Sequence, residues 1–344
     1  MDEINFNSQK FQNKNQRKRK RFFLILGFAV FGYIFFNTGI IANKVSIEPI
    51  WTKKFATLLF FNQNQAQEID PDYVMPEKEQ TRLDILILGI RGENDADAEL
   101  AGALLTDTIM VFSHDQVTKK SSLISIPRDL YVKIYNKKDK INAAYEYGLL
   151  RKEGTNYAKR LISQITGTYI DNVIVVDFSS FEKLIDQLGG IDITLAKPFK
   201  EEGQWGYVFE LPAGTNHLDG QNALYYARSR YSTTDFDRAS RQQQILFAIK
   251  DKLIKLSIIS DPIKTLSIVN NLGQNIKTDI NLWNIKGIID LGKEIDTSPT
   301  VFKKNVLSTD NLLYQTTDPR GTYILLPQGD NFQQIKEFFK NSLN

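Results

Sequence analysis

Short, mostly apolar runs of strand length recur along the C-terminal three quarters of the chain. Leu83–Leu88 is one such run and ends at a glycine-containing turn. Two more, Thr108–Phe112 and Ser122–Ile126, flank the polar segment His114–Lys120. Apolar runs of this length between polar turns are typical of buried strands. The sequence therefore predicts three neighbouring strands, the last two joined as an antiparallel hairpin.

Downstream, apolar residues at helical spacing alternate with further strands. A strand is predicted at Asn172–Val176, followed by a helix that ends at a glycine pair, and then by a strand at Ile191–Leu195. Leu218–Tyr226 is predicted as a short helix, and a long helix is predicted at Arg238–Leu256, capped by Asp237. Other helices are expected at residues 145–150, 157–165, 282–293 and near the C-terminus, after a hairpin around residues 318–321. This alternation predicts a layered α/β domain.

Upstream, residues 22–43 contain no charged side chain and are mostly Phe, Ile, Leu, Val, Ala and Gly. This length crosses a bilayer and exceeds the apolar core of a cleavable signal peptide. Residues 1–21 carry seven basic side chains against two acidic ones, which favours a cytoplasmic location. We therefore predict a single-pass protein of the cell membrane with a basic cytoplasmic tail (1–21), one N-terminal transmembrane helix (22–43), a stalk or linker (44–80) and an extracytoplasmic catalytic domain (81–344).

Charge and cysteine content narrow the functional classes. The net charge is +3, from 43 Lys plus Arg and 40 Asp plus Glu, and the tail alone contributes +5. Subtracting +5 from +3 leaves the remainder at about −2, which argues against a nucleic-acid-binding surface. A DNA-binding role for the tail is a weak alternative beside an apolar span. The sequence has no cysteine, which excludes thiolate metal sites and cysteine catalysis and fits an extracytoplasmic domain.

Four arginines fall within fourteen residues: Arg228, Arg230, Arg238 and Arg241. If the long helix begins at Arg238, then Arg238, Arg241 and Gln242 share a face at its N-terminal end, where the helix dipole favours an anion. Guanidinium groups bind phosphate or carboxylate through paired donors, so the cluster predicts an anion clamp with phosphate as its natural ligand. The alternative is a solvated network between these arginines and neighbouring aspartates.

A second group lies at the ends of the predicted hairpin strands, with Asp107 before one strand and Arg128 after the next. In an antiparallel pair these ends share one edge of the sheet, so the two side chains are expected to meet. A carboxylate beside arginines suits a bridging Mg²⁺, a base for an attacking hydroxyl, or an ordinary ion pair. The sequence has no Walker, Rossmann or His-Glu-x-x-His motif. Phosphoryl transfer by positioning and charge neutralisation needs only the residue types present.

Six segments stand out in this order along the chain: Leu105–Val111, Ser125–Val132, Lys140–Tyr145, Leu218–Gly220, Tyr226–Tyr231 and Asp235–Gln244. Together they resemble the signature blocks of the LytR-CpsA-Psr family of bacterial cell-envelope proteins. The resemblance implies an α/β/α sandwich with a mixed central sheet, displayed outside the membrane. It also implies transfer of a glycopolymer with its proximal phosphate from a polyprenyl-pyrophosphate carrier to a peptidoglycan acceptor.

Carried over by position, the resemblance also implies roles for individual residues. Pyrophosphate would be held by Arg128, Arg228, Arg230, Arg238, Arg241, Gln242 and Lys140; catalysis would involve Asp107, Arg128 and Arg238; and Mg²⁺ would be ligated by Asp107 and Asp95. Many family members carry a second acidic residue two positions after the glycine that ends the first strand, where this chain has Arg91. Three alternatives follow from this departure: Asp95 or Asp97 on the next loop replaces the missing carboxylate, the site binds metal more weakly, or Arg91 itself does part of the neutralising.

Two other functional classes stay open at this point. A pyrophosphatase would hydrolyse the same lipid-linked substrate without an acceptor, and a labelled-lipid assay with and without peptidoglycan separates it from a transferase. A non-catalytic envelope protein would bind an anion or attenuate transcription. A membrane span at residues 22–43 disfavours action on DNA, because it would separate the arginines from the cytoplasm.

Overall fold

The computed structural model describes residues 75–344, except for 94, 96, 259–260, 262, 265–266, 269–275, 281–284, 296 and 299. The predicted tail (1–21), the predicted transmembrane helix (22–43) and almost all of the predicted stalk (44–80) lie outside the described residues. Within the described part, no helix combines the length and the apolar character that a membrane crossing requires.

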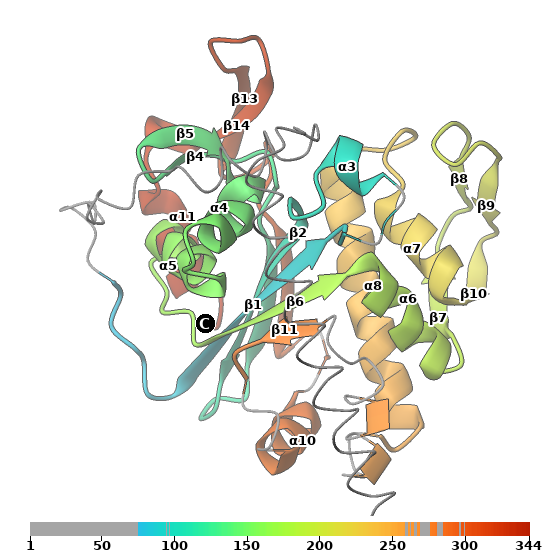
Figure 1. Ribbon diagram of the computed structural model, residues 1–344. Helices are drawn as coiled ribbons and strands as arrows, with labels where there is room; N and C mark the ends of the chain where they lie inside the picture. The colour runs from blue at the N-terminus through green and yellow to red at the C-terminus, as the bar shows by residue number, and fades with distance from the viewer. Residues whose placement is uncertain are drawn as a thin grey trace, which may run out of the picture. The chain divides into compact units, whose positions relative to one another are not determined.

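A six-stranded mixed sheet forms the middle layer, with the strand order β11-β6-β1-β2-β3-β12 (Figure 1). Its strands are β1 (Arg82–Ile90), β2 (Thr106–Asp115), β3 (Ser121–Ser125), β6 (Asn172–Asp177), β11 (Ile276–Thr278) and β12 (Phe302–Val306). β1 runs antiparallel to β2 and parallel to β6, and β3 runs antiparallel to β2 and parallel to β12. The three neighbouring strands and their hairpin are confirmed. β12 was not predicted, because it is a partly polar strand at an edge of the sheet.

Helices cover both faces of this sheet (Figure 1). One face is covered by α4 (Ala144–Leu150), α5 (Thr155–Thr166) and α11 (Gln333–Lys340), and the other by α8 (Asp235–Lys255) and α10 (Ile285–Glu294). The predicted α/β/α sandwich with a mixed sheet is confirmed for the described residues. Smaller elements of this part are α3 (Ala98–Ala101), β4 (Tyr131–Ile134), β5 (Lys137–Lys140), β13 (Leu313–Thr317) and β14 (Tyr323–Pro327).

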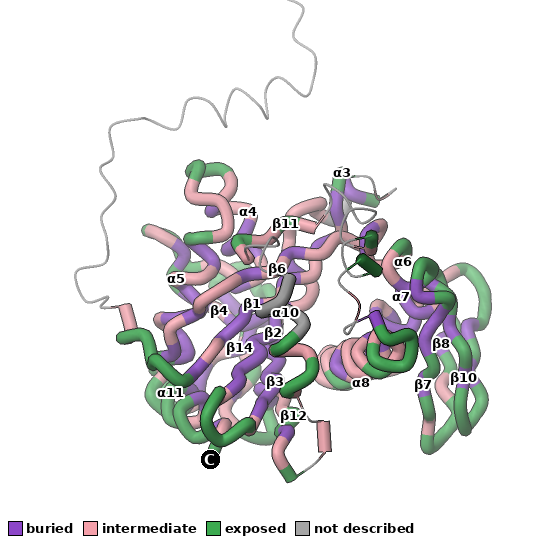
Figure 2. Tube along the Cα trace, turned by 90° about the horizontal axis from the view of Figure 1, so that it is seen from below, coloured by how far each residue is buried: buried purple, intermediate pink, exposed green. Residues whose placement is uncertain are grey.

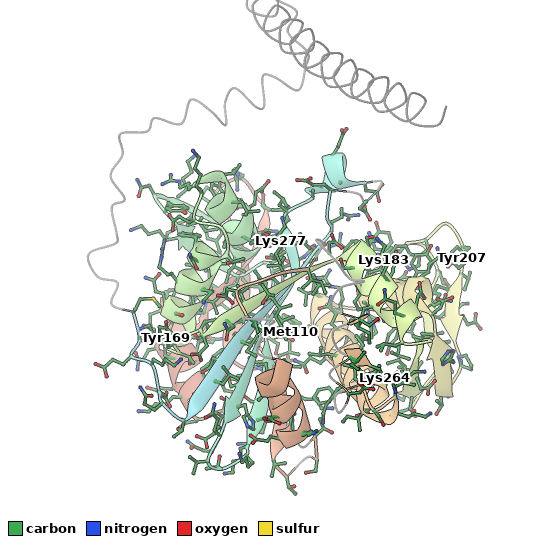
Figure 3. All side chains as sticks on the ribbon, turned by 60° about the horizontal axis from the view of Figure 1, so that its bottom comes forward. Met110, Tyr169, Lys183, Tyr207, Lys264 and Lys277 are labelled. Carbon is green, nitrogen blue, oxygen red and sulfur yellow. The ribbon has the colours of Figure 1, made fainter. Side chains whose placement is uncertain are left out.

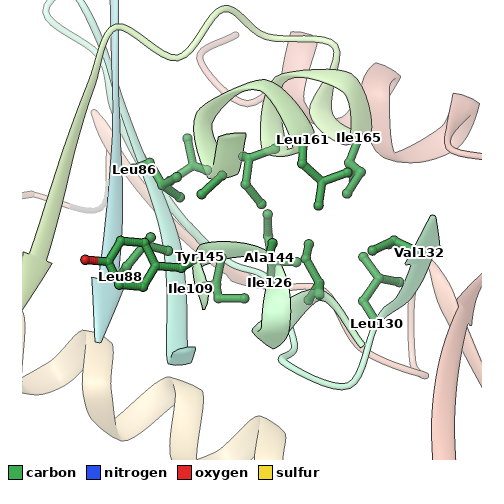
Figure 4. Close-up of a cluster of buried hydrophobic side chains, with 14 of the residues drawn as sticks. Leu86, Leu88, Ile109, Ile126, Leu130, Val132, Ala144, Tyr145, Leu161 and Ile165 are labelled. Carbon is green, nitrogen blue, oxygen red and sulfur yellow. The ribbon is translucent and has the colours of Figure 1, made fainter. Parts of the chain in front are cut away.

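Apolar side chains fill the space between the sheet and α5. Leu86, Leu88 and Ile109 of the sheet belong to one buried cluster with Leu161 and Ile165 of α5 (Figure 4). Alternate residues of β1 join a smaller cluster on the opposite face. Figure 2 shows the resulting burial, with mostly buried residues along β1, β2 and β3. A strand covered on both faces has few polar positions, which is why β1 could be predicted as an apolar run.

A second apolar core supports the part of the domain beyond α8. Its elements are α6 (Phe178–Gln187), β7 (Ile191–Leu195), β8 (Phe199–Glu201), β9 (Phe209–Leu211), β10 (Gly214–Leu218) and α7 (Gly220–Arg228). β7 was predicted as a strand, but it pairs antiparallel with β10 rather than with the central sheet. β8 and β9 form a hairpin. Side chains of this hairpin, α7 and α8 share the second core. Glu201 and Gln204 of the hairpin accept hydrogen bonds from the backbone of residues 230–232, which places the hairpin beside the turn between these two helices.

The long helix α8 begins three residues earlier than predicted. Its N-cap is Thr234, so the prediction that Asp237 caps the helix is wrong. Oγ1 of Thr234 accepts a hydrogen bond from N of Asp237 at 3.1 Å, and Oδ2 of Asp237 accepts one from N of Thr234 at 3.0 Å. This reciprocal pair is a capping box, which an acidic residue three positions after a threonine can form. Arg238 is consequently the fourth residue of the helix.

The core between β1 and α5 gives a stability prediction. Leu86 is 0% exposed, and Leu86→Ala is expected to lower the free energy of unfolding by about 2–5 kcal/mol through lost contacts and a cavity. Val117, which is 71% exposed, provides the control, and Val117→Ala is expected to change stability by less than about 0.5 kcal/mol. Urea unfolding measures both variants. Equal stability of the two would contradict this account of the core.

Candidate active site

A β-bulge places Asp107 at the edge of the central sheet. Gly89 pairs with Thr108, but the next residue of β1, Ile90, pairs with Thr106, so Asp107 is the extra residue on β2. A bulge redirects a side chain away from the regular strand pattern. Glycine permits the close pairing, because a Cβ on Gly89 would lie 2.9 Å from Cβ of Thr108. The local sequence therefore determines where this carboxylate lies.

Arg128 follows β3 and reaches the same edge of the sheet. Its Nη1 donates a hydrogen bond to Oδ1 of Asp107 at 2.5 Å. The expectation that the two ends of the hairpin bring these residues together is confirmed. Both side chains are largely shielded from solvent, so their attraction is screened less than that of a surface ion pair.

A pocket of about 190 Å³ lies beside this ion pair. Its lining contains five arginines, two aspartates, an amide and two aromatic side chains: Arg91, Arg128, Arg228, Arg230, Arg238, Asp97, Asp107, Gln204, Trp205 and Tyr231. The arginines come from the loop after β1, the segment after β3, the end of α7, the following turn and the start of α8. The excess of positive charge in one concave surface favours an anionic ligand.

A carboxylate behind the pocket holds two of its arginines. Oδ2 of Asp235 lies 2.9 Å from Nη2 of Arg238 and 3.3 Å from Nε of Arg128. Burial acts to lower the pKa of Arg128, but the neighbouring carboxylates, Asp107 first, outweigh burial and leave the pKa raised. Arg128 therefore stays fully charged although little of it contacts water.

Arg228 and Arg91 form another side of the pocket, with less compensation. The guanidinium of Arg228 lies 4.3 Å from the ring centre of Phe178 and 5.1 Å from that of Trp205. Asp95 pairs with Arg91 at 2.8 Å and with Arg228 at only 3.9 Å. Burial lowers the pKa of Arg228, and repulsion from Arg91 lowers it further. The charge of Arg228 is thus incompletely balanced within the protein.

Arg238 and Arg230 add to this imbalance. The pKa of Arg238 is lowered by burial and by repulsion from Arg128 and Arg230, against the attraction of its carboxylate partner. Arg230 is exposed and has no ion-pair partner within the described ranges. An anion in the pocket would place negative charge between these guanidinium groups and relieve their repulsion. The geometry therefore suits a ligand with more than one negative charge.

Arg241 and Gln242, both predicted to bind the pyrophosphate, lie outside the pocket lining. Nε of Arg241 donates to the carbonyl oxygen of Tyr226 at 3.0 Å, and its Nη2 donates to the carbonyl oxygen of Ser229. Nε2 of Gln242 donates to the carbonyl oxygen of Ala227 at 3.2 Å. Both side chains satisfy carbonyls at the C-terminal end of α7, which have no partner within the helix. They thereby fix the turn that connects α7 to α8.

Lys140 also lies outside the lining and supports it from behind. Its Nζ donates to Oδ1 of Asp129 at 2.5 Å, and Oδ2 of Asp129 lies 3.8 Å from Nε of Arg128. Lys140 therefore acts on Arg128 through an intervening carboxylate. A direct contact of Lys140, Arg241 or Gln242 with a pyrophosphate stays a prediction.

Comparison with known proteins identifies the family. A model of the LytR_cpsA_psr family matches residues 55–341, which includes nearly the whole described domain and every residue of the pocket. The chain belongs to the LytR-CpsA-Psr family. The resemblance drawn from the six sequence segments is thereby confirmed.

Named relatives within the LytR-CpsA-Psr family match most of the chain. Polyisoprenyl-teichoic acid–peptidoglycan teichoic acid transferase TagT of Bacillus subtilis (strain 168) is 27% identical over 265 residues, covering 75% of this chain and 76% of TagT. Regulatory protein MsrR of Staphylococcus aureus (strain COL) is 30% identical over 269 residues, covering 76% of each chain. The solved structure of TagT bound to LIIa-WTA is similar with a TM-score of 0.58 at 25% identity, covering 78% of this chain and 94% of that chain.

The carboxylates of the pocket suit a partial magnesium site. Mg²⁺ prefers octahedral oxygen coordination and commonly combines one or two carboxylates with phosphate oxygens and water. Asp107 and Asp97 line the pocket, whereas Asp95 does not, and Oδ1 of Asp95 accepts a hydrogen bond from Arg91. In the described part of the chain, no group of three or more His, Asp or Glu residues is placed to hold a metal ion. A Mg²⁺ ion here would therefore take most of its ligands from phosphate and water.

The sequence reasoning missed one wall of the pocket, the loop between β8 and β9. Gln204 and Trp205 of this loop line the pocket beside Tyr231. Oε1 of Gln204 accepts a hydrogen bond from N of Arg230 at 2.8 Å, and its Nε2 donates to the carbonyl oxygen of Arg228 at 3.0 Å. The sequence signal was weak, since a glutamine and a tryptophan between glycines indicate a loop but not what the loop contacts.

Replacement by alanine is expected to lower the stability of the fold much more at Arg241 than at Arg230. Arg241→Ala leaves two buried carbonyls without a donor, and it should destabilise the fold by about 1–3 kcal/mol for each. Arg230→Ala, at an exposed position, should change stability by less than about 0.5 kcal/mol. Thermal unfolding measures both. The reverse order of stabilities would overturn the structural role given to Arg241.

Proposed function

We propose that this protein transfers a glycopolymer, with its proximal phosphate, from a polyprenyl-pyrophosphate carrier to a hydroxyl of peptidoglycan. The observation that carries the proposal is a pocket lined by five arginines, one of which, Arg128, is paired with Asp107. The proposal is supported by TagT, whose name describes transfer of teichoic acid from a polyisoprenyl carrier to peptidoglycan. MsrR bears a regulatory name instead. The arginine-lined pocket supports the transferase description, because it suits a phosphate-bearing substrate.

The charges of the pocket match a pyrophosphate that joins a lipid to a glycan. Such a diester carries one negative charge on each phosphate. The acceptor hydroxyl must approach the phosphate that carries the glycan, while the other phosphate leaves with the lipid. Arg228, Arg230 and Arg238 reach the pocket from the end of α7, the following turn and the start of α8, whereas Arg128 reaches it from the segment after β3. Positioning and charge neutralisation are the main requirements of phosphoryl transfer, and arginines on two sides supply both.

In the proposed reaction, the acceptor oxygen bonds to the phosphorus that carries the glycan. The bond from that phosphorus to the bridging oxygen breaks, and polyprenyl phosphate leaves with the electron pair. In this proposal Asp107, which lines the pocket, accepts the proton of the hydroxyl, and the arginines stabilise the charge that develops on the leaving phosphate. Mg²⁺ held by Asp107 would neutralise phosphate oxygens, in which case Asp107 acts as a ligand rather than as the base.

Attachment to the membrane through residues 22–43 is part of the proposal. A carrier with a polyprenyl tail remains in the bilayer, so an enzyme anchored at the outer surface is held close to its substrate. The charge-free segment preceded by a basic tail supports this placement. Protease treatment of intact spheroplasts should degrade the domain at residues 81–344 and leave the N-terminal tail protected.

The test of the proposed reaction is an assay with a labelled lipid-linked glycan, with and without peptidoglycan. Arg228→Ala is expected to reduce transfer by roughly 100-fold or more, because it removes a poorly compensated cation from the pocket. Lys200→Ala is the control: Lys200 pairs with Glu202 on the hairpin, outside the pocket, and transfer should be unchanged. Two results together would identify a pyrophosphatase instead. Without peptidoglycan, the label would be released as free glycan phosphate, and with peptidoglycan, no label would be joined to the peptidoglycan.

Chelation of divalent cations tests the magnesium part of the proposal. EDTA should abolish transfer and added Mg²⁺ should restore it, because phosphate oxygens need neutralisation. If Asp107 is a ligand, Asp107→Asn should raise the Mg²⁺ concentration required for half-maximal activity. Asp95→Asn is the matched comparison, since Asp95 is paired with Arg91. An Asp107→Asn variant that loses activity at every Mg²⁺ concentration, with an unchanged Mg²⁺ requirement, would assign Asp107 as the base.

A further inference from the structure

Tyr231 is an exposed aromatic side chain at the edge of the arginine pocket. It is 68% exposed, yet it lines the pocket together with Arg230 and Trp205. Within the described ranges, no aromatic ring or cation lies over its ring; a Cβ placed on Gly203 would be 3.7 Å from its Cδ2. The ring therefore rests beside the glycine of the loop and leaves aromatic surface open to a ligand.

The backbone that carries Tyr231 is held firmly by the β8–β9 hairpin. Oε2 of Glu201, a residue that is 0% exposed, accepts hydrogen bonds from N of Tyr231 at 3.0 Å and from N and Oγ of Ser232, both at 3.2 Å. Gln204 accepts a hydrogen bond from N of Arg230, the preceding residue. A fixed backbone with an exposed aromatic ring is preorganised for contact, because little conformational freedom is lost on binding.

Trp205 and Tyr207, on the loop between β8 and β9, are less suited to contact a ligand. Trp205 is stacked on Tyr225 with ring centres 4.6 Å apart, and the guanidinium of Arg228 lies 5.1 Å from its ring centre. Its ring is thus already in contact with two side chains of the protein. Tyr207 is 49% exposed but does not line the pocket, and Figure 3 shows it on the outer hairpin. Tyr231 alone combines an open ring with a place in the lining, among the aromatic residues that the structure describes there.

We propose that Tyr231 is a sugar-binding residue, whose ring stacks on the apolar face of a pyranose next to the pyrophosphate. This inference rests on the proposed function, which supplies a sugar bonded directly to a phosphate in the donor and a sugar hydroxyl in the acceptor. A pyranose presents C–H groups on one face, and an aromatic ring contacts such a face while its hydroxyl can bond to solvent or sugar. Tyr231 and Arg230 are adjacent and line one pocket, so a sugar phosphate can contact Arg230 through its phosphate and Tyr231 through its ring.

The experiment measures binding of three probes to the full-length protein in detergent micelles. The first is geranylgeranyl pyrophosphate, the second is the same lipid carrying one N-acetylglucosamine on its pyrophosphate, and the third is a peptidoglycan disaccharide added with the first probe. Tyr231→Ala should weaken binding of one sugar-containing probe by roughly three- to tenfold and leave the sugar-free lipid unaffected. Tyr231→Phe should restore binding, since the ring is retained. Tyr207→Ala is the control, because it removes an exposed tyrosine that does not line the pocket, and it should leave binding of all three probes unchanged.

The outcomes distinguish the sugar contact from the pyrophosphate site. If Tyr231→Ala loses affinity only for the lipid-linked sugar, Tyr231 contacts the donor. If it loses affinity only for the disaccharide, Tyr231 contacts the acceptor. Equal affinities of wild type and Tyr231→Ala for every probe would overturn the inference and leave the proposed function intact. An equal loss for the sugar-free lipid would also overturn it, because Tyr231 would then act through Arg230. Failure of the wild type to bind any pyrophosphate would instead refute the proposed function.

Discussion

Mutual repulsion among guanidinium groups is the constraint on which the rest of this site depends. Five arginines line one pocket, where burial removes part of the water that would solvate them. Asp107, Asp235 and Asp95 each contact one or two of these arginines and hold them in place. These carboxylates lie on a bulge, at a helix N-terminus and on a loop after β1, so the fold fixes their positions. The pocket is thereby preorganised for an anion.

The sequence predicted the features that local pattern determines. β1, β2 and β3 were recognisable as apolar runs, and the meeting of Asp107 with Arg128 followed from one antiparallel hairpin. The edge position of β12 and the pairing of β7 with β10 depend on contacts between distant segments, which no local pattern encodes. The start of α8 was misplaced because Thr234 and Asp237 are both good capping residues, and only their geometry distinguishes N-cap from third residue.

The same limit applies to the candidate site. Spacing along a helix determines which side chains share a face, but not what that face contacts. Arg241 follows Arg238 by three residues and is expected on the same face of α8. Its donors nevertheless bind carbonyl oxygens at the end of α7, because these carbonyls have no partner within their own helix. Gln204 was missed for a related reason. Its amide matters because a hairpin brings it to the backbone of Arg230, a contact that exists only after folding.

The pocket lies between elements that pack on two different apolar cores. Asp107 and Arg128 lie on the sheet, which rests on the core beneath α5, whereas Gln204 and Arg230 belong to the wall supported by the second core. Electrostatic interactions fall with distance, so the field in the pocket depends on the spacing between these two supports. An anion that contacts arginines from both sides adds an attraction across this junction and stabilises the arrangement that binds it. The contacts that give affinity for the anion therefore also order the arginines that line the pocket. A neutral ligand of similar size would make no such contacts and would order none of these arginines.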